Sequence, residues 1–134
     1  MRLRERVALV TGAGGRLGTA VAKRLTSEGA SVVCADRNFQ AAENTASASF
    51  DKGTMATAYE ADVSEYDQCS SQVVETVRRY GHIDIAVNNA GIGLHKLALD
   101  TTPEDWERVM RINLTGSFLT AQAAVRKGKL VARN

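Results

Sequence analysis

The sequence predicts an α/β fold: a doubly wound parallel sheet of about four strands, covered by helices on both faces in a three-layer arrangement. Two observations predict it. Short apolar runs alternate with helical patterns along most of the chain, and this alternation is typical of parallel strands joined by right-handed crossovers. Glycine or polar residues follow each apolar run, at the strand ends where such sheets bind ligands.

The first strand and helix are predicted by residues 7–29. The apolar run 7–10 ends in Thr11-Gly12 and a glycine-dense turn, and a helical pattern then continues to Gly29. Glycine lets the backbone turn sharply and lets a ligand approach closely. The free N–H groups at a helix N-terminus favour an anion such as a pyrophosphate. The stretch therefore predicts either a phosphate site or a plain turn, and G-x-G-x-x-G does not match because Leu17 stands at its third glycine.

The remaining elements follow in chain order, with strands read from apolar runs and helices from their periodicity. They are a strand at 31–36, an alanine-rich helix at 39–50, a turn at 51–53, a weaker strand at 55–60, a capping box at 64–67, a helix at 69–80 that Gly81 ends, a strand at 83–87, a glycine-bearing loop at 88–93 and a helix capped by 102–105.

Composition excludes several classes of function. The net charge of +2 gives no attraction to nucleic acid or to an anionic membrane surface. No apolar run reaches the roughly 18 residues of a membrane span, and the N-terminal residues lack the apolar core of a signal peptide. Cys34 and Cys69 have the pattern of buried reduced thiols, which indicates the cytoplasm. His82 and His95 lack ligand spacing, so we expect no metal site.

An aspartate stands at the end of the second predicted strand and another follows the third, and each could have either of two roles. Asp36 could accept hydrogen bonds from both ribose hydroxyls of an adenosine, which would favour NAD, or it could be a helix cap or turn residue. Its neighbour Arg37 could offset the repulsion of a 2′-phosphate and admit NADP. Asp62 could accept from an adenine amino group with Val63 against the ring, or it could belong to a turn.

Asparagines mark the last two elements. The run 88–91, Asn-Asn-Ala-Gly, could hold its loop through side-chain amide bonds to backbone groups, or it could be a simple Asx turn. Asn113 falls on an apolar helix face with Trp106 and Met110, so we expect it to be buried. There it bonds a backbone carbonyl or a water, or it serves a catalytic site.

Together these residues resemble the short-chain dehydrogenase/reductase family. The matching motifs, in family order, are Thr11-Gly12 with Gly18, Asp36, Asp62-Val63, Asn88-Asn89-Ala90-Gly91 and Asn113 within Ile112–Gly116. The resemblance implies a Rossmann-type fold, a nicotinamide cofactor and hydride transfer between an alcohol and a ketone. It implies cofactor contacts from Gly12, Gly15, Arg16, Leu17, Gly18, Asp36, Arg37, Asp62, Val63, Asn89, Ala90 and Gly91, and a catalytic role for Asn113.

The sequence departs from the family in two places. The middle glycine of the single-domain branch would fall on Arg16, whereas Gly15 gives the spacing of the extended branch, so Arg16 can either reach a phosphate or crowd it. The family's catalytic Ser and Tyr-x-x-x-Lys follow a fifth strand, and no tyrosine here has a lysine four residues later. From about residue 125 the resemblance ends. We therefore expect one cofactor-binding domain, 1–134, that is C-terminally truncated.

Two functions remain open. The first is an NAD-dependent oxidoreductase for which this chain supplies the cofactor-binding half, with NADP less favoured than NAD. The second is a non-catalytic dinucleotide-binding module or an inactive fragment. The partners expected are a nicotinamide dinucleotide and, in any full-length form, a small alcohol or ketone. Nucleic acid and membranes are excluded, and homo-oligomerisation is left open.

Overall fold

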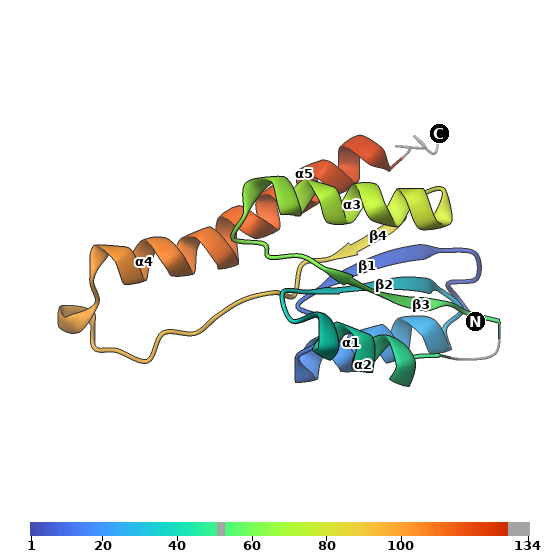
Figure 1. Ribbon diagram of the computed structural model, residues 1–134, viewed down its shortest axis with the longest axis horizontal. Coiled ribbons are helices and arrows are strands. Elements are labelled where there is room, and N and C mark those ends of the chain that lie inside the picture. Colours follow the sequence, from blue (N-terminus) through green and yellow to red (C-terminus); the bar gives the residue numbers. More distant parts are fainter. Residues whose placement is uncertain (51–52, 129–134) are drawn as a thin grey trace.

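The computed structural model describes residues 1–50 and 53–128. Four parallel strands form one sheet in the order β3-β2-β1-β4 (Figure 1). The strands are β1 (Val7–Thr11), β2 (Ser31–Asp36), β3 (Ala56–Glu60) and β4 (Ile85–Val87). The predicted α/β parallel sheet is confirmed, and β1 lies inside it with β2 and β4 as neighbours.

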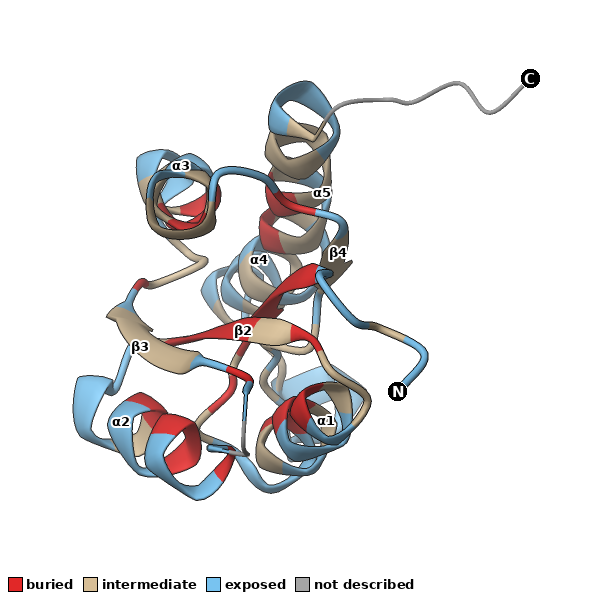
Figure 2. Cartoon of the chain, turned by 90° about the vertical axis from the view of Figure 1, so that its right-hand side faces the viewer, coloured by how far each residue is buried: buried red, intermediate tan, exposed pale blue. Residues whose placement is uncertain are grey.

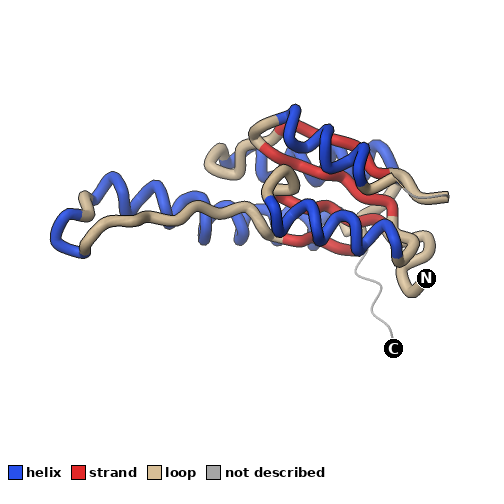
Figure 3. Tube along the Cα trace, turned by 90° about the horizontal axis from the view of Figure 1, so that it is seen from below, coloured by secondary structure: helices blue, strands red, loops and turns tan. Residues whose placement is uncertain are grey.

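Helices cover both faces of the sheet. On one face lie α1 (Arg16–Ser27) and α2 (Phe39–Ala48), and on the other lie α3 (Tyr66–Tyr80) and α5 (Gly116–Lys127) (Figure 1). Between β4 and α5 the chain forms the short helix η1 (Ala98–Asp100), then α4 (Pro103–Met110), then a π-helical turn, η2 (Arg111–Thr115). The segment with η1 and α4 extends away from the sheet, as Figure 3 shows from below.

Alternate residues of the strands build two halves of the core, because successive side chains of a strand point to opposite faces. Val10 and Cys34 belong to the cluster that includes Ala22 of α1, whereas Leu9 and Val33 belong to the one that includes Val73 of α3. Burial is therefore concentrated in β1 and β2 and on the sheet-facing sides of the helices, whereas β3 and β4 are mostly of intermediate exposure (Figure 2). Both sheet faces being covered explains why the strands read as continuous apolar runs.

Most helix ends agree with the prediction. Gly29 and Gly81 follow α1 and α3 with φ of 99° and 84°, the left-handed conformation that glycine adopts at helix C-termini. Thr102 begins α4 in a capping box with Asp105. The capping box predicted at 64–67 is wrong, because Glu65 is the N-cap of α3 and makes no side-chain bond there. Residues 51–52 of the predicted turn lie outside the described residues.

The predicted burial of Asn113 beside Trp106 is also wrong. Asn113 is exposed, and Trp106 keeps 61% of its surface accessible. The prediction assumed one regular helix packed on the sheet. In the structure α4 extends beyond the sheet, and η2 changes the helical period before Asn113 is reached (Figure 3).

Candidate functional site

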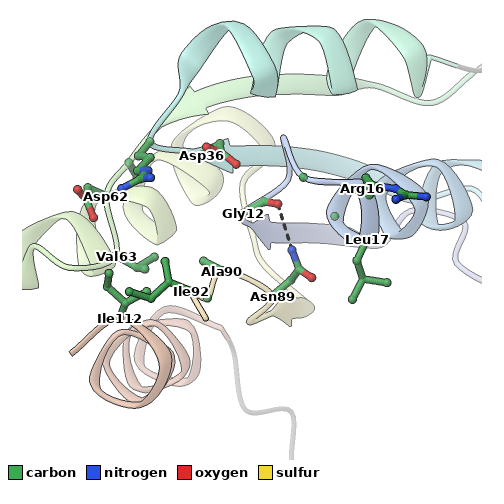
Figure 4. Close-up of a pocket in the computed structure, with 15 residues that line it drawn as sticks. Gly12, Arg16, Leu17, Asp36, Asp62, Val63, Asn89, Ala90, Ile92 and Ile112 are labelled. Carbon is green, nitrogen blue, oxygen red and sulfur yellow. Dashed lines mark hydrogen bonds between the residues drawn. The ribbon is translucent and has the colours of Figure 1, made fainter. Parts of the chain in front are cut away.

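A cleft of about 430 Å³ opens at the carboxyl ends of the strands. Figure 4 shows its lining. All the residues predicted to contact a cofactor line it, together with three that the sequence did not indicate: Gly12, Gly15, Arg16, Leu17, Gly18, Asp36, Arg37, Asp62, Val63, Asn89, Ala90 and Gly91, with Ala61, Ile92 and Ile112. The structure thus brings the predicted cofactor residues together, and their role in binding stays a prediction. Asn113 lies outside this lining.

The glycine turn after β1 is shaped by two close approaches. Gly12 has φ of +61°, and a Cβ there would lie 2.8 Å from the Cα of Ala90. A Cβ on Gly18 would lie 2.3 Å from the carbonyl oxygen of Gly12. Neither position accepts a larger residue without backbone movement. The turn can therefore sit against both the loop after β4 and the first turn of α1 because these two residues are glycines.

The N-terminus of α1 meets the requirements of an anion site. Gly15 is its N-cap, makes no side-chain cap bond, and the first turn contains no acidic residue. The first N–H groups of a helix have no partner within the helix, and the helix dipole adds partial positive charge there. Arg16 is exposed at the first helical position. The end of α1 that lines the cleft therefore fits a phosphate group.

Asn89 joins the glycine turn to the loop after β4. Its Nδ2 donates to the carbonyl oxygens of Thr11 at 3.0 Å and Gly12 at 3.1 Å, and the second bond is drawn in Figure 4. The Oγ1 of Thr11 accepts from the backbone N–H groups of Asn89 and Ala90, both at 3.1 Å. Of the two readings left open for residues 88–91, the structure supports side-chain amide bonds that hold the loop.

Asp36 occupies the cleft at the end of β2. Its Oδ2 accepts from the N–H of Gly14 and its Oδ1 from the N–H of Asn38, both at 2.9 Å. The helix cap is Asn38, whose Oδ1 accepts from Ala41, so Asp36 is not the cap of α2. Backbone bonds fix the half-buried carboxylate between the glycine turn and the start of α2, where it presents negative charge to the cleft.

Asp62 lies at the end of β3 and also forms a turn. Its Oδ1 accepts from the N–H of Ser64 at 2.9 Å, and its own N–H donates to Oε1 of Gln68 at 2.8 Å. Val63 packs beneath Gly116, where a Cβ would meet the Val63 carbonyl oxygen at 2.8 Å. The turn reading of Asp62 is thus observed, and an adenine contact remains a prediction for the same side chain.

The exposed side chain of Asn113 hydrogen-bonds to the backbone of a neighbouring loop and does not lie in the core. Its Oδ1 accepts from the N–H of Ile92, and its Nδ2 donates to the carbonyl oxygen of Ile92, both at 2.8 Å. A Cβ on Gly91 would lie 3.3 Å from the Asn113 Oδ1. The side chain therefore fixes the two peptide groups on either side of Ile92, in the loop that lines the cleft. A helix-face pattern could not indicate this contact, because it depends on where η2 meets the loop.

The other titratable candidates lie apart from the cleft. His95 is exposed and is not a lining residue, and His82 contacts Asp84 with its Nε2 3.1 Å from Oδ2. Among residues 1–50 and 53–128, no three His, Cys, Asp or Glu side chains gather to hold a metal. Cys34 and Cys69 are buried free thiols, as predicted. Burial raises the pKa of the Cys34 thiol to about 12, so it stays protonated.

The fold and the site are those of a parallel α/β domain with a cleft at the carboxyl ends of its strands, and comparison with known proteins identifies its family. The family model described as short chain dehydrogenase matches residues 6–132. The chain belongs to the short-chain dehydrogenase family. The matched range extends past residue 125, where the sequence resemblance was expected to end. Within the described part of the chain, no helix is long and apolar enough to cross a membrane.

Individual relatives agree with this assignment. Versicolorin reductase 1 of Aspergillus parasiticus is 41% identical over 126 residues, which are 93% of this chain and 48% of that protein. The structure of NAD⁺-bound xylitol dehydrogenase has a TM-score of 0.89 at 37% identity, covering 95% of this chain and 49% of the other. A 3-ketoacyl-(acyl-carrier-protein) reductase from Brucella melitensis complexed with NADH has a TM-score of 0.86 at 36% identity, covering 93% and 50%. The chain spans about half the length of the relatives it matches.

Proposed function

We propose that this chain forms the dinucleotide-binding part of an oxidoreductase that transfers hydride between an alcohol and a ketone, with NAD preferred over NADP. The observation that carries the proposal is the Asp36 carboxylate fixed at the rim of a cleft that also contains the N-terminus of α1. Two solved relatives, the NAD⁺-bound xylitol dehydrogenase and the ketoacyl reductase complexed with NADH, support a nicotinamide cofactor. Buried free thiols support the cytoplasm as its compartment.

Each part of the cleft has a task in this proposal. The N–H groups at the start of α1 bind the pyrophosphate, and Asp36 accepts from the ribose hydroxyls. Asp62 and Val63 contact the adenine. The bound nicotinamide supplies or accepts the hydride. Asn89 and Asn113 hydrogen-bond to backbone in the structure, so they keep the glycine turn and the backbone of Ile92 in place.

Binding without turnover is a second candidate for the chain of 134 residues. Reduction of a ketone needs an acid that protonates the developing oxyanion, and such an acid contributes about 10²–10⁴-fold. No tyrosine in this sequence is followed by lysine four residues later. The Asn113 amide cannot release a proton at neutral pH. This observation favours a module that binds dinucleotide and that needs a proton donor from elsewhere for catalysis.

Calorimetric titration with NADH and NADPH tests the cofactor assignment. We expect the unmodified chain to bind NADH more tightly. Asp36→Ala should narrow the difference, because loss of a hydrogen bond to a charged group costs about 1.5–3 kcal/mol, or roughly ten- to a hundredfold in affinity. The substitution should weaken the binding of NADH.

Asp36→Asn is the matched control. It keeps an acceptor for the Gly14 N–H and removes the charge that repels a 2′-phosphate, while the bond from the Asn38 N–H is lost because the amide NH2 is a donor. NADPH binding should therefore improve in Asp36→Asn without loss of fold. Equal or tighter binding of NADPH by the unmodified chain would contradict the preference for NAD.

A further inference from the structure

The π-helical turn η2 contacts two of the loops that line the cleft. One loop, 61–65, follows β3, and the other, 90–92, follows β4. From η2, Asn113 holds the backbone N–H and carbonyl groups of Ile92 in the second loop. Ile112 lines the cleft beside Val63 and Ile92, so side chains from the turn and from both loops meet there (Figure 4).

Arg111, the first residue of η2, holds the other loop. Its Nε donates to the carbonyl oxygen of Ser64 at 2.6 Å. Its guanidinium carbon lies 4.4 Å from the centroid of the Tyr66 ring. A guanidinium can donate in its plane while it stacks with its face, so the two contacts together define its position. Arg111 therefore fastens the start of α3 to η2.

The Ser64 residue transmits this contact to Asp62. While its carbonyl oxygen accepts from Arg111, its N–H donates to Oδ1 of Asp62 at 2.9 Å. Within residues 1–50 and 53–128, Oδ1 is the Asp62 oxygen that is engaged, which leaves Oδ2 for a ligand. Arg111 does not line the cleft itself. Of its two side-chain contacts, the one to Ser64 leads to Asp62 in the cleft.

We infer that Arg111 is a positioning residue that orients the Asp62 carboxylate toward the adenine ring of a bound dinucleotide. This inference rests on the proposed function. It assigns the recognition of adenine to a relay from η2 through the backbone of Ser64 to a cleft carboxylate. A dinucleotide whose base cannot donate a hydrogen bond to Asp62 does not bind more tightly when Arg111 holds the carboxylate in place. The difference in affinity between such a ligand and NADH therefore measures the role of Arg111.

The test compares two dinucleotides in calorimetric titrations: NADH and the reduced dinucleotide in which unsubstituted purine replaces adenine. The second lacks the amino group, keeps N1 as an acceptor, and so loses the donor to Asp62. The unmodified chain should prefer NADH by about tenfold, the value of one charged hydrogen bond. In Arg111→Met and Arg111→Ala the preference should fall to about twofold or less, because the carboxylate is no longer held.

Two variants serve as controls. Arg111→Lys should restore the preference, since an ammonium group can still donate to the Ser64 carbonyl. Arg108→Ala removes an exposed arginine of the neighbouring helix α4 and should behave like the unmodified chain. Arg111→Met retains an apolar side chain over Tyr66, so it separates the lost donor from lost packing.

Five outcomes decide the matter. A reduced preference in both Arg111→Met and Arg111→Ala supports the inference. It is overturned if these variants keep the full preference, or if both dinucleotides weaken by the same factor, which would indicate a general effect on the fold. Equal binding of the two ligands by the unmodified chain also overturns it. Binding of neither ligand by the unmodified chain would refute the proposed function itself.

Discussion

A single side-chain amide, that of Asn89, joins two loops that are far apart in the sequence. It supplies donors to the carbonyl oxygens of Thr11 and Gly12, while the close approach of Gly12 to Ala90 leaves no room for a Cβ between the loops. The two residues have complementary roles. The Asn89 amide holds the loops together, and the absence of a Cβ at Gly12 lets them approach each other.

Replacing Asn89 should therefore destabilise the fold. Asn89→Ala leaves two partly buried carbonyl oxygens without their donor, and we expect a loss of about 1–3 kcal/mol in the free energy of unfolding. Urea denaturation measures it. Asn88→Ala, at the exposed neighbouring position, is the control and should stay within about 0.5 kcal/mol of the unmodified chain. Equal stability of the two variants would mean that the amide bonds contribute nothing.

At the scale of elements, helix α3 protects the edge of the sheet. Among the described strands β3 pairs with β2 alone, so the backbone groups on its other side are open to intermolecular pairing. Arg79 of α3 donates to the carbonyl oxygen of Ala58 at 2.8 Å and lies 5.6 Å from the Tyr59 ring centroid. Glu75 accepts from Arg79 at 2.7 Å and keeps it in place.

This ion-pair network makes stability depend on pH. Hydrogen bonds from Arg78 and then Arg79 lower the pKa of Glu75 to about 2, from an ordinary value of 4.5. A carboxyl whose pKa is lower in the folded state stabilises the fold above its unfolded pKa and loses this contribution as pH falls. The contribution should be complete above about pH 5 and lost progressively between pH 4.5 and about 2.

Unfolding free energies of the unmodified chain and Glu75→Gln at several pH values provide the test. Near neutral pH the variant should be less stable by about 1 kcal/mol or less, because the pair is close to the surface. The difference should close as the pH approaches 2. Glu107→Gln, at an exposed position on α4, should show no such change. A difference for Glu75→Gln that is constant with pH would exclude this role.

At the scale of the whole molecule, the cleft of the described residues combines groups suited to binding, and no tyrosine, lysine or histidine lines it. Its lining offers helix N–H groups, carboxylates and loop backbone. The usual proton donor of the family has no counterpart in this sequence, and His95 is exposed and outside the lining. Binding and turnover should therefore separate in this chain.

We expect the chain of 134 residues to be catalytically silent. The measurement follows NADH absorbance with a panel of ketones and secondary alcohols, after purification from host dehydrogenases. His95→Ala is assayed beside it, because histidine is the side chain that most often transfers protons in catalysis. Turnover that disappears in His95→Ala would identify that residue as the acid. Turnover in both proteins would show that an unrecognised donor exists.

Local signals predicted most of this molecule. Apolar runs located all four strands, and Asp36, Asp62 and Asn89 stood out because each follows such a run. The sheet topology then carried these residues to one cleft. Each residue could be found from its own short stretch of sequence. The three residues meet because the carboxyl ends of parallel strands lie at the same edge of the sheet.

The predictions were wrong where contacts between elements, rather than local sequence, determine a residue's exposure and hydrogen bonds. Asn113 reads as a core residue by helical spacing, yet the π-helical turn and the extended position of α4 expose it. Ser64 reads as a helix cap, yet its N–H is bound by Asp62 and its carbonyl by Arg111. Arg111 itself carries no sequence signal, because an arginine on an amphipathic helix is normally a solvated residue.

The two ends of β4 are tied to β1, and this has a consequence for how the chain is made. At one end the Val7 N–H donates to Asp84, 77 positions later, at 2.9 Å. At the other end Asn89 binds the Thr11 carbonyl. A ribosome that adds about 5–20 residues per second needs roughly 4–15 s to pass from the first partner to the second.

During that time β2 can already cover one side of β1, whereas the other side has no strand to pair with. The newborn chain therefore carries an open edge on an apolar strand for seconds, which is long enough for association with other chains or with a chaperone. The strand that is synthesised first and becomes fully buried is enclosed only after two-thirds of the chain has emerged, so slowing translation before residue 84 should increase co-translational aggregation.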